Sequence, residues 1–154
     1  MKLRKEIKQT KPFRSLQQEA GLALLKTTDL LRRHLARAIE PYNLSLEQYN
    51  VLRILRGAGH TGMATLEVSS RMIEQTPAIT RLMDKLEAKK LVRRERCLQD
   101  RRQVLCWITN NGLALLSQME EEVESAGQEP FAHLNRVEIK SLIKILDHIR
   151  EKKF

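Results

Sequence analysis

The sequence has few of the features that mark a secreted, membrane-bound or catalytic protein. Its 154 residues include only two cysteines, too few for the disulfide framework of a small secreted domain. No apolar run approaches the roughly 20 residues of a membrane-spanning helix, and the basic first dozen residues do not resemble a signal peptide. We therefore expect a cytoplasmic protein that has no membrane partner.

Signatures of metal and enzyme sites are also missing. The four histidines are scattered without the spacing of metal ligands. The sequence has neither a nucleophile elbow nor a dinucleotide-binding fingerprint. Three glycines fall within residues 57–62, but the Lys-Ser/Thr ending of a phosphate-binding loop does not follow them. The sequence therefore predicts no metal, no cofactor and no enzymatic activity.

What the sequence has in excess is positive charge, and that charge is unevenly distributed. The formal net charge at pH 7 is +9. Residues 81–102 hold nine lysines and arginines against four acidic residues, whereas residues 110–154 hold six against eight. A polyanion partner explains this asymmetry better than solubility does. A basic membrane-surface helix is the competing interpretation, but the cations do not lie opposite a wide apolar helical face.

Residues 65–109 have the pattern of a short helix, a tight turn, a second helix and a basic two-stranded hairpin. In the second helix, Thr76 is the expected N-cap and Pro77 suits the first helical position. An apolar stripe at helical spacing is predicted to enter the core: Ile79, Leu82, Met83 and Leu86. The opposite face is small, hydroxylated or cationic: Ala78, Thr80, Arg81 and Lys85. Such a face fits a DNA major groove, although its two cations are equally typical of a solvated helix.

The hairpin is predicted from two runs of residues that favour extended backbone, Leu91–Arg96 and Val104–Ile108. The connection between them carries Asp100, Arg101 and Arg102. An arginine at a hairpin tip can enter a DNA minor groove. A nearby aspartate can hold that guanidinium through a charge-assisted hydrogen bond.

This segment resembles the DNA-binding lobe of the MarR (multiple antibiotic resistance regulator) family. The matching residues are Leu86-Glu87, Leu91-Val92, Arg94, Asp100-Arg101-Arg102 and the Thr-x-x-Gly of Thr109 to Gly112. The resemblance implies that Arg102 is the minor-groove residue and that Asp100 orients it. The family usually has glycine where Lys90 stands. A left-handed lysine there would cost roughly 1 kcal/mol, so we expect the end of this helix to differ locally.

From the two arguments together we predict one set of DNA-contacting residues. They are Thr76, Pro77, Ala78, Thr80, Arg81, Lys85, Arg94, Asp100, Arg101 and Arg102.

The flanking segments are predicted to be mostly helical. A long helix is expected over residues 13–40, after a frayed basic tail, and its expected length is about 42 Å. Ser45 and Gln48 form a capping box that opens a helix to about Arg56. Thr109 is predicted to cap a helix that ends near Ser125, and a second capping box, at Asn135 to Glu138, opens the last helix.

The predicted fold is mainly α with a small β-hairpin wing, in a single MarR-like domain over residues 1–154. Residues 41–109 form the winged helix-turn-helix DNA-binding lobe, and residues 13–40 and 110–154 form a helical dimerisation lobe. If the terminal helices packed only on one another, apolar surface would stay in water. A second copy would cover that surface, and the resemblance implies the same dimer.

We therefore predict a dimeric, sequence-specific transcription regulator that binds double-stranded DNA at a palindromic operator. A ligand-responsive repressor is the form that the resemblance favours. It also implies a small aromatic or phenolic acid as effector, in a pocket between the first helices and the DNA lobe. The candidate lining residues are His34, Arg37, Tyr42 and Tyr49.

Three alternatives stay open at this stage. One is a winged-helix module that contacts proteins rather than DNA, and another is an enzyme built on the same scaffold. The third is a thiol-based redox regulator, in which Cys97 and Cys106 face one another across a hairpin centred near Arg101 and Arg102. Two reduced cytosolic thiols are the simpler interpretation of these cysteines, and the one we favour.

Overall fold

The computed structural model describes residues 2–75 and 77–151 and shows helices built around a small sheet. The α-helices are α1 (Lys2–Glu6), α2 (Leu16–Ile39), α3 (Leu46–Ala58), α4 (Thr65–Arg71), α5 (Ile79–Ala88), α6 (Asn110–Gln128) and α7 (Arg136–Glu151). Short 3-10 turns, η1 (Glu40–Tyr42), η2 (Gly59–Thr61) and η3 (Glu129–Phe131), follow α2, α3 and α6. The strands are β1 (Met63–Ala64), β2 (Val92–Arg96) and β3 (Val104–Ile108). The predicted class, mainly α with a small hairpin wing, is confirmed.

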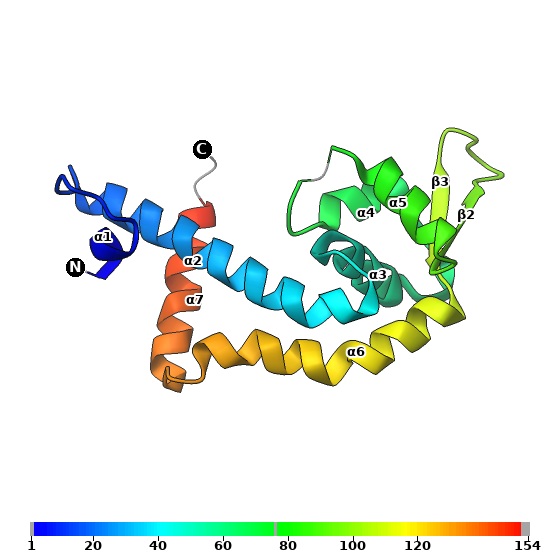
Figure 1. Cartoon of the computed structure of the whole chain (residues 1–154). Coiled ribbons are helices and arrows are strands. Elements are labelled where there is room, and N and C mark those ends of the chain that lie inside the picture. The colour runs from blue at the N-terminus through cyan, green and yellow to red at the C-terminus, as the bar shows by residue number, and fades with distance from the viewer. Residues whose placement is uncertain (1, 76, 152–154) are drawn as a thin grey trace.

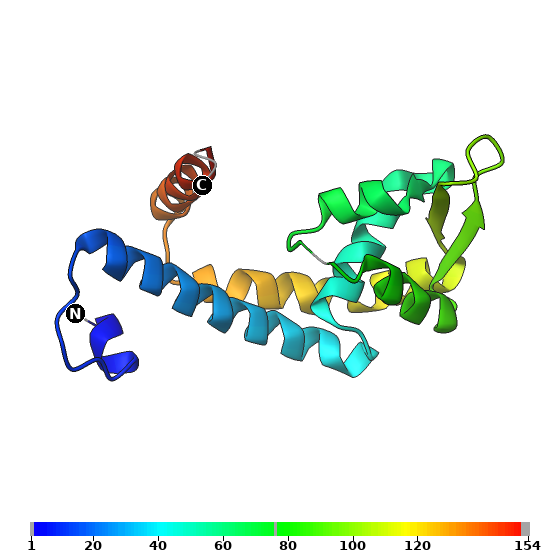
Figure 2. The same cartoon turned by 90° about the horizontal axis from the view of Figure 1, so that it is seen from above.

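The two longest helices, α2 and α6, run side by side and give the molecule its elongated shape (Figures 1 and 2). Helices α3, α4 and α5 gather with the β2–β3 hairpin at one end, and α7 leaves α6 at the other end. The division into a DNA-binding lobe and a dimerisation lobe stays our interpretation of this arrangement. No helix in the described residues is long and apolar enough to cross a membrane.

Side-chain caps start four of the helices. The hydroxyl of Ser45 accepts a hydrogen bond from Gln48 N, and the Gln48 side chain accepts one from Ser45 N, as a capping box requires. The caps at Thr109 and Asn135 are confirmed as well. The predicted start of the long helix was three residues early, because Ser15 caps it. The expected frayed tail was wrong, since α1 forms there.

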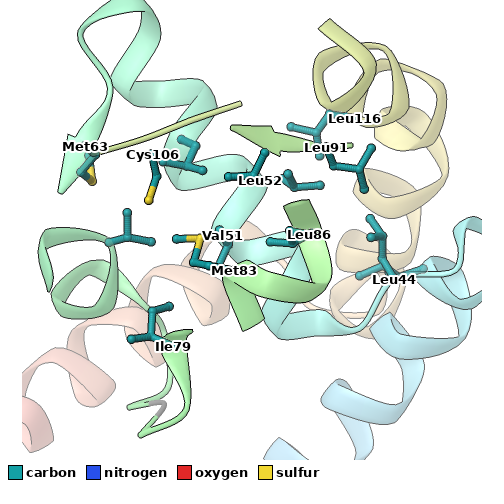
Figure 3. Packing of buried hydrophobic residues seen from close by; sticks show 14 of the residues in the cluster. Leu44, Val51, Leu52, Met63, Ile79, Met83, Leu86, Leu91, Cys106 and Leu116 are labelled. Atoms are coloured by element: carbon teal, nitrogen blue, oxygen red, sulfur yellow. The ribbon is translucent and has the colours of Figure 1, made fainter. Parts of the chain in front are cut away.

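The core lies beneath helix α5. Met83 and Leu86 are fully buried and point toward Val51 and Leu52 of α3 (Figure 3). Ile79 is also buried and Leu82 is partly buried, which confirms the predicted stripe. Burial of four such side chains contributes several kcal/mol in total, so this contact fixes which face of α5 turns outward.

The sheet has the order β1-β3-β2, with a short third strand that the sequence did not predict. Arg94 pairs with Cys106 in the β2–β3 register, and Cys97 N donates to Gln103 O. The hairpin is therefore centred on Asp100 rather than between Arg101 and Arg102.

This register overturns the proposed facing of the two thiols. Cys106 lies opposite Arg94 rather than Cys97, and both cysteines are free. Cys106 is fully buried beside the Thr65 hydroxyl, and burial raises the pKa of its thiol. A buried thiol with a raised pKa is a poor nucleophile, so we do not retain the disulfide switch.

Helix α5 ends in a Schellman motif built around Lys90. The Leu91 N–H donates to Leu86 O at 3.0 Å and the Lys90 N–H donates to Glu87 O at 2.8 Å. Leu86 and Leu91 are both buried and supply the apolar contact that accompanies this motif. Lys90 has a φ of 59°, so the left-handed geometry usual for glycine is kept with a lysine in its place, and the expected local difference at the helix end was wrong.

The next helix begins where its backbone comes close to this same loop. Thr109 N donates to Leu91 O at 3.0 Å, and its hydroxyl donates to Lys90 O and accepts from Gly112 N. A Cβ on Gly112 would lie 2.5 Å from Leu91 O. The Thr-x-x-Gly motif therefore joins the end of α5 to the start of α6, and only glycine fits at its last position.

Replacing Lys90 with glycine should stabilise the protein by about 0.5–1 kcal/mol, because glycine adopts positive φ without steric cost. Urea unfolding at a fixed protein concentration measures this change. Ala88→Gly is the control and should destabilise by about 1 kcal/mol, since Ala88 is an exposed residue in the last turn of α5. A Lys90→Gly variant no more stable than wild type would contradict this account of the loop.

Candidate DNA-binding surface

The outward face of α5 carries most of the predicted major-groove residues. Ala78, Thr80, Arg81 and Lys85 are all exposed, opposite the buried Met83. Pro77 and Ala78 form the turn that leads into the helix, whose first residue is Ile79. Pro77 is therefore not the first helical residue, and Ala78 takes the N-cap position without a side-chain hydrogen bond. The predicted cap, Thr76, lies outside the described residues.

An open groove of about 1040 Å³ runs along one side of α5. Its lining includes Pro77, Ala78, Arg81 and Lys85, four of the predicted contact residues. The far wall comes from the α2–α3 junction and contributes Glu40 among its residues. Arg81 and Lys85 therefore face solvent along an open groove that is wide enough for a large ligand.

The hairpin tip presents Asp100, Arg101 and Arg102, all of them exposed. Asp100 Oδ1 accepts a hydrogen bond from the Arg102 backbone N–H at 3.0 Å, and Asp100 O accepts one from Gln103 N at 2.9 Å. Asp100 therefore orders the backbone beneath Arg102, rather than pairing with its guanidinium as we predicted. Leu98 at the same tip is 99% exposed, so none of the described residues covers its side chain.

The structure gives Arg94 a role different from the predicted DNA contact. Its guanidinium lies 2.6 Å from both Glu87 Oε2 and Asp84 Oδ1, and the side chain is only 20% exposed. The hydrogen bond to Glu87 is the main reason that the pKa of Arg94 is raised above its ordinary value. Arg94 thus ties the wing strand β2 to the recognition helix, and we remove it from the contact set.

A second cavity, of about 310 Å³, lies between α2, α3, the end of α6 and the turn that joins α4 to α5. Of the four predicted effector residues only Tyr49 lines it. Arg37 is exposed elsewhere on α2, and the Tyr42 hydroxyl donates to Glu122 on α6 at 2.9 Å. That hydrogen bond is the main cause of the raised pKa of Tyr42.

His34 is the third of the predicted effector residues that does not line this cavity. Its Nε2 lies 3.1 Å from Glu129 Oε2, but the geometry is not that of a hydrogen bond. The prediction failed because it used residue type alone. Tyr42 and His34 both lie on the side of the α2–α3 region that faces the α6–η3 segment.

The sequence did not indicate two arginines, Arg32 and Arg53, that line the 310 Å³ cavity beside Tyr49. Arg32 on α2 pairs with Glu47 at 3.4 Å and with Glu74. Arg53 on α3 lies 5.9 Å above the centre of the Tyr49 ring. Helical spacing places Tyr49 and Arg53 four residues apart on one face, which was the one signal available. Nothing in the sequence indicated that Arg32 would meet Glu74.

Comparisons with known proteins agree with this geometry. The family model of the SarA/Rot transcriptional regulators matches residues 35–119. A MarR transcription factor from Planctomyces limnophilus is 39% identical, with 88% of this chain and 98% of that chain covered and a TM-score of 0.68. The chain belongs to the MarR family of winged helix-turn-helix transcription regulators.

Two further relatives show what this fold is used for elsewhere. Bordetella bronchiseptica BpsR, whose DNA binding is regulated by 6-hydroxynicotinic acid, is 26% identical with a TM-score of 0.75, and 86% of this chain and 98% of that one are covered. The homoprotocatechuate degradative operon repressor of Escherichia coli is 23% identical over 126 residues, 82% of this chain and 84% of the relative. The prediction of a regulator rather than an enzyme is confirmed by the family.

Substitutions of the two wing arginines, Arg102 and Arg94, should have different effects: one on DNA affinity and the other on stability. Arg102→Ala removes an exposed cation and should weaken DNA binding by about tenfold or more while leaving stability unchanged. Arg94→Ala should instead lower the free energy of unfolding by about 1–2 kcal/mol, because it leaves Glu87 and Asp84 without their partner. Fluorescence anisotropy and urea unfolding measure the two effects. Unchanged DNA binding in Arg102→Ala would refute the assignment of the wing.

Proposed function

We propose that this MarR-family protein is a dimeric repressor that binds a palindromic operator and is released by a small aromatic acid. One observation carries the proposal: α5 buries its apolar stripe and turns Arg81 and Lys85 outward, in the same lobe as the exposed hairpin tip of Arg101 and Arg102. The separation of buried and cationic faces suits a helix in the major groove and a wing in the adjacent minor groove. The Escherichia coli relative that represses an operon supports repression rather than activation.

The dimer is proposed from apolar surface that one protomer leaves in water. None of the described α7 side chains is buried, although α7 is strongly amphipathic. Ile143 is 53% exposed and Ile149 is 43% exposed on its apolar stripe, and Leu25 on α2 is 68% exposed. An apolar helix face of this length is normally covered. A twofold-related copy would cover it with the same face of its own helices.

The dimer proposal predicts that one charge on the α7 stripe separates the protomers. Ile143→Glu should weaken self-association by at least about tenfold, because a carboxylate would be buried without a partner. Sedimentation velocity over a range of protein concentrations measures this. Ser141→Glu adds the same charge to the opposite face of α7 and should leave the dimer intact. Equal sedimentation of the two variants would contradict the proposed interface.

The DNA-binding proposal predicts a defined operator. Selection from a random duplex pool should return an inverted repeat whose half-sites are about 10 base pairs apart, one DNA turn. Binding should weaken steeply with salt, and each lost phosphate contact should reduce the slope of log affinity against log salt by about 0.9. A pool that shows no enrichment, or an enriched site without twofold symmetry, would contradict the proposal.

The cavity beside Tyr49 is the proposed effector site. Its walls include the apolar side chains of Leu35, Leu46 and Met72. Within the part of the chain that the structure describes, Arg53 has a ring contact but no ion-pair partner. An aromatic acid would fit this lining, with its ring between the apolar walls and its carboxylate near the guanidinium of Arg53. The aromatic acid that regulates BpsR belongs to the same chemical class.

A further inference from the structure

The tip of the wing carries an apolar side chain among polar ones. Leu98 is 99% exposed, the highest value of any large apolar side chain among the described residues. The residues that follow it in the connection between β2 and β3 are all polar or charged: Gln99, Asp100, Arg101 and Arg102. A single exposed leucine is ordinary on a protein surface, so the meaning of Leu98 depends on what the residues around it bind.

Hydrogen bonds order the backbone on both sides of Leu98. Cys97 N donates to Gln103 O at 2.9 Å, which is the last bond that joins the two arms of the hairpin. Beyond it, Gln103 N donates to Asp100 O at 2.9 Å, and the Arg102 N–H donates to Asp100 Oδ1 at 3.0 Å. Leu98 directly follows the last bond on one arm, and Arg102 directly precedes it on the other. The leucine and the cation therefore come from matching positions of one ordered loop.

This loop projects beyond the helices of its lobe (Figures 1 and 2). Arg101 and Arg102 give it two positive charges, against one negative charge on Asp100. A leucine beside cations matches the minor groove of a DNA duplex, where phosphates attract the cations and the base steps offer apolar stacked faces. Leucine is also one of the side chains that DNA-bending proteins insert between base pairs from the minor groove.

A protein partner fits the same tip less well. Apolar patches that mark protein interfaces cover a few hundred Å² or more. One leucine among charged and amide side chains is much smaller than that, and Arg101 and Arg102 favour an anionic partner.

We propose that Leu98 is an apolar wedge that enters a base step of the minor groove beside the wing arginines. The wing then reads two properties of the operator. The arginines favour a narrow, A·T-rich groove, and Leu98 favours a step that unstacks easily, such as TA or CA/TG. This inference rests on the proposed DNA binding and deepens it, because it names a residue that determines specificity.

Leu98→Ala separates the wedge from the charge of the wing. The variant should bind the selected operator about fivefold more weakly, because the apolar contact is lost in both protomers. Its slope of log affinity against log salt should match wild type, since no cation is removed, whereas Arg102→Ala should lower that slope. Leu98→Met should restore the affinity, because methionine also serves as a wedge. Fluorescence anisotropy at several salt concentrations measures all three variants.

Leu66→Ala is the matched control, since Leu66 is 81% exposed on α4 of the same lobe. It should bind the operator as wild type does. A 2-aminopurine base at the step beneath the wing supplies a second readout, because its fluorescence rises when the step unstacks. The rise should occur with wild type and with Leu66→Ala, but not with Leu98→Ala.

The outcomes distinguish the wedge from the function on which it rests. If wild type binds the operator, and Leu98→Ala matches Leu66→Ala in affinity or in 2-aminopurine fluorescence, the wedge is refuted. If wild type binds no duplex, it is the proposed function that fails.

Discussion

The packing of α5 on α3 is the contact on which the other features of the DNA-binding lobe depend. Met83 and Leu86 are fully buried against a core that includes Val51 and Leu52. Because successive helical residues are about 100° apart, burying this stripe sets the direction of every other α5 side chain. The cationic face is therefore a consequence of the core, and the wing is joined to it by Arg94, which reaches from β2 to Glu87 and Asp84.

Local signals in the sequence were enough to predict the elements that are built locally. The capping box at Ser45 and the cap at Thr109 each need only a few neighbouring residues, and both formed as predicted. The position of Asp100 could not be read in the same way, because hairpin register depends on the turn and on which side chains the core accepts. An error of one or two residues in the turn centre was enough to pair Cys97 with the wrong residue.

Contacts between distant segments were the hardest to predict. Arg32 and Glu74 are 42 positions apart, and Tyr42 meets Glu122 on α6. No spacing rule relates such pairs, so the predicted effector residues were chosen by chemistry alone and only Tyr49 reached the cavity.

We propose that two copies of the unit formed by α5 and the wing bind one DNA duplex. A hydroxyl-radical footprint of the protein on its selected operator tests this most directly. We expect two protected patches related by twofold symmetry, about 10 base pairs apart, each flanked by minor-groove protection from a wing. A single protected patch, or protection without symmetry, would contradict the claim.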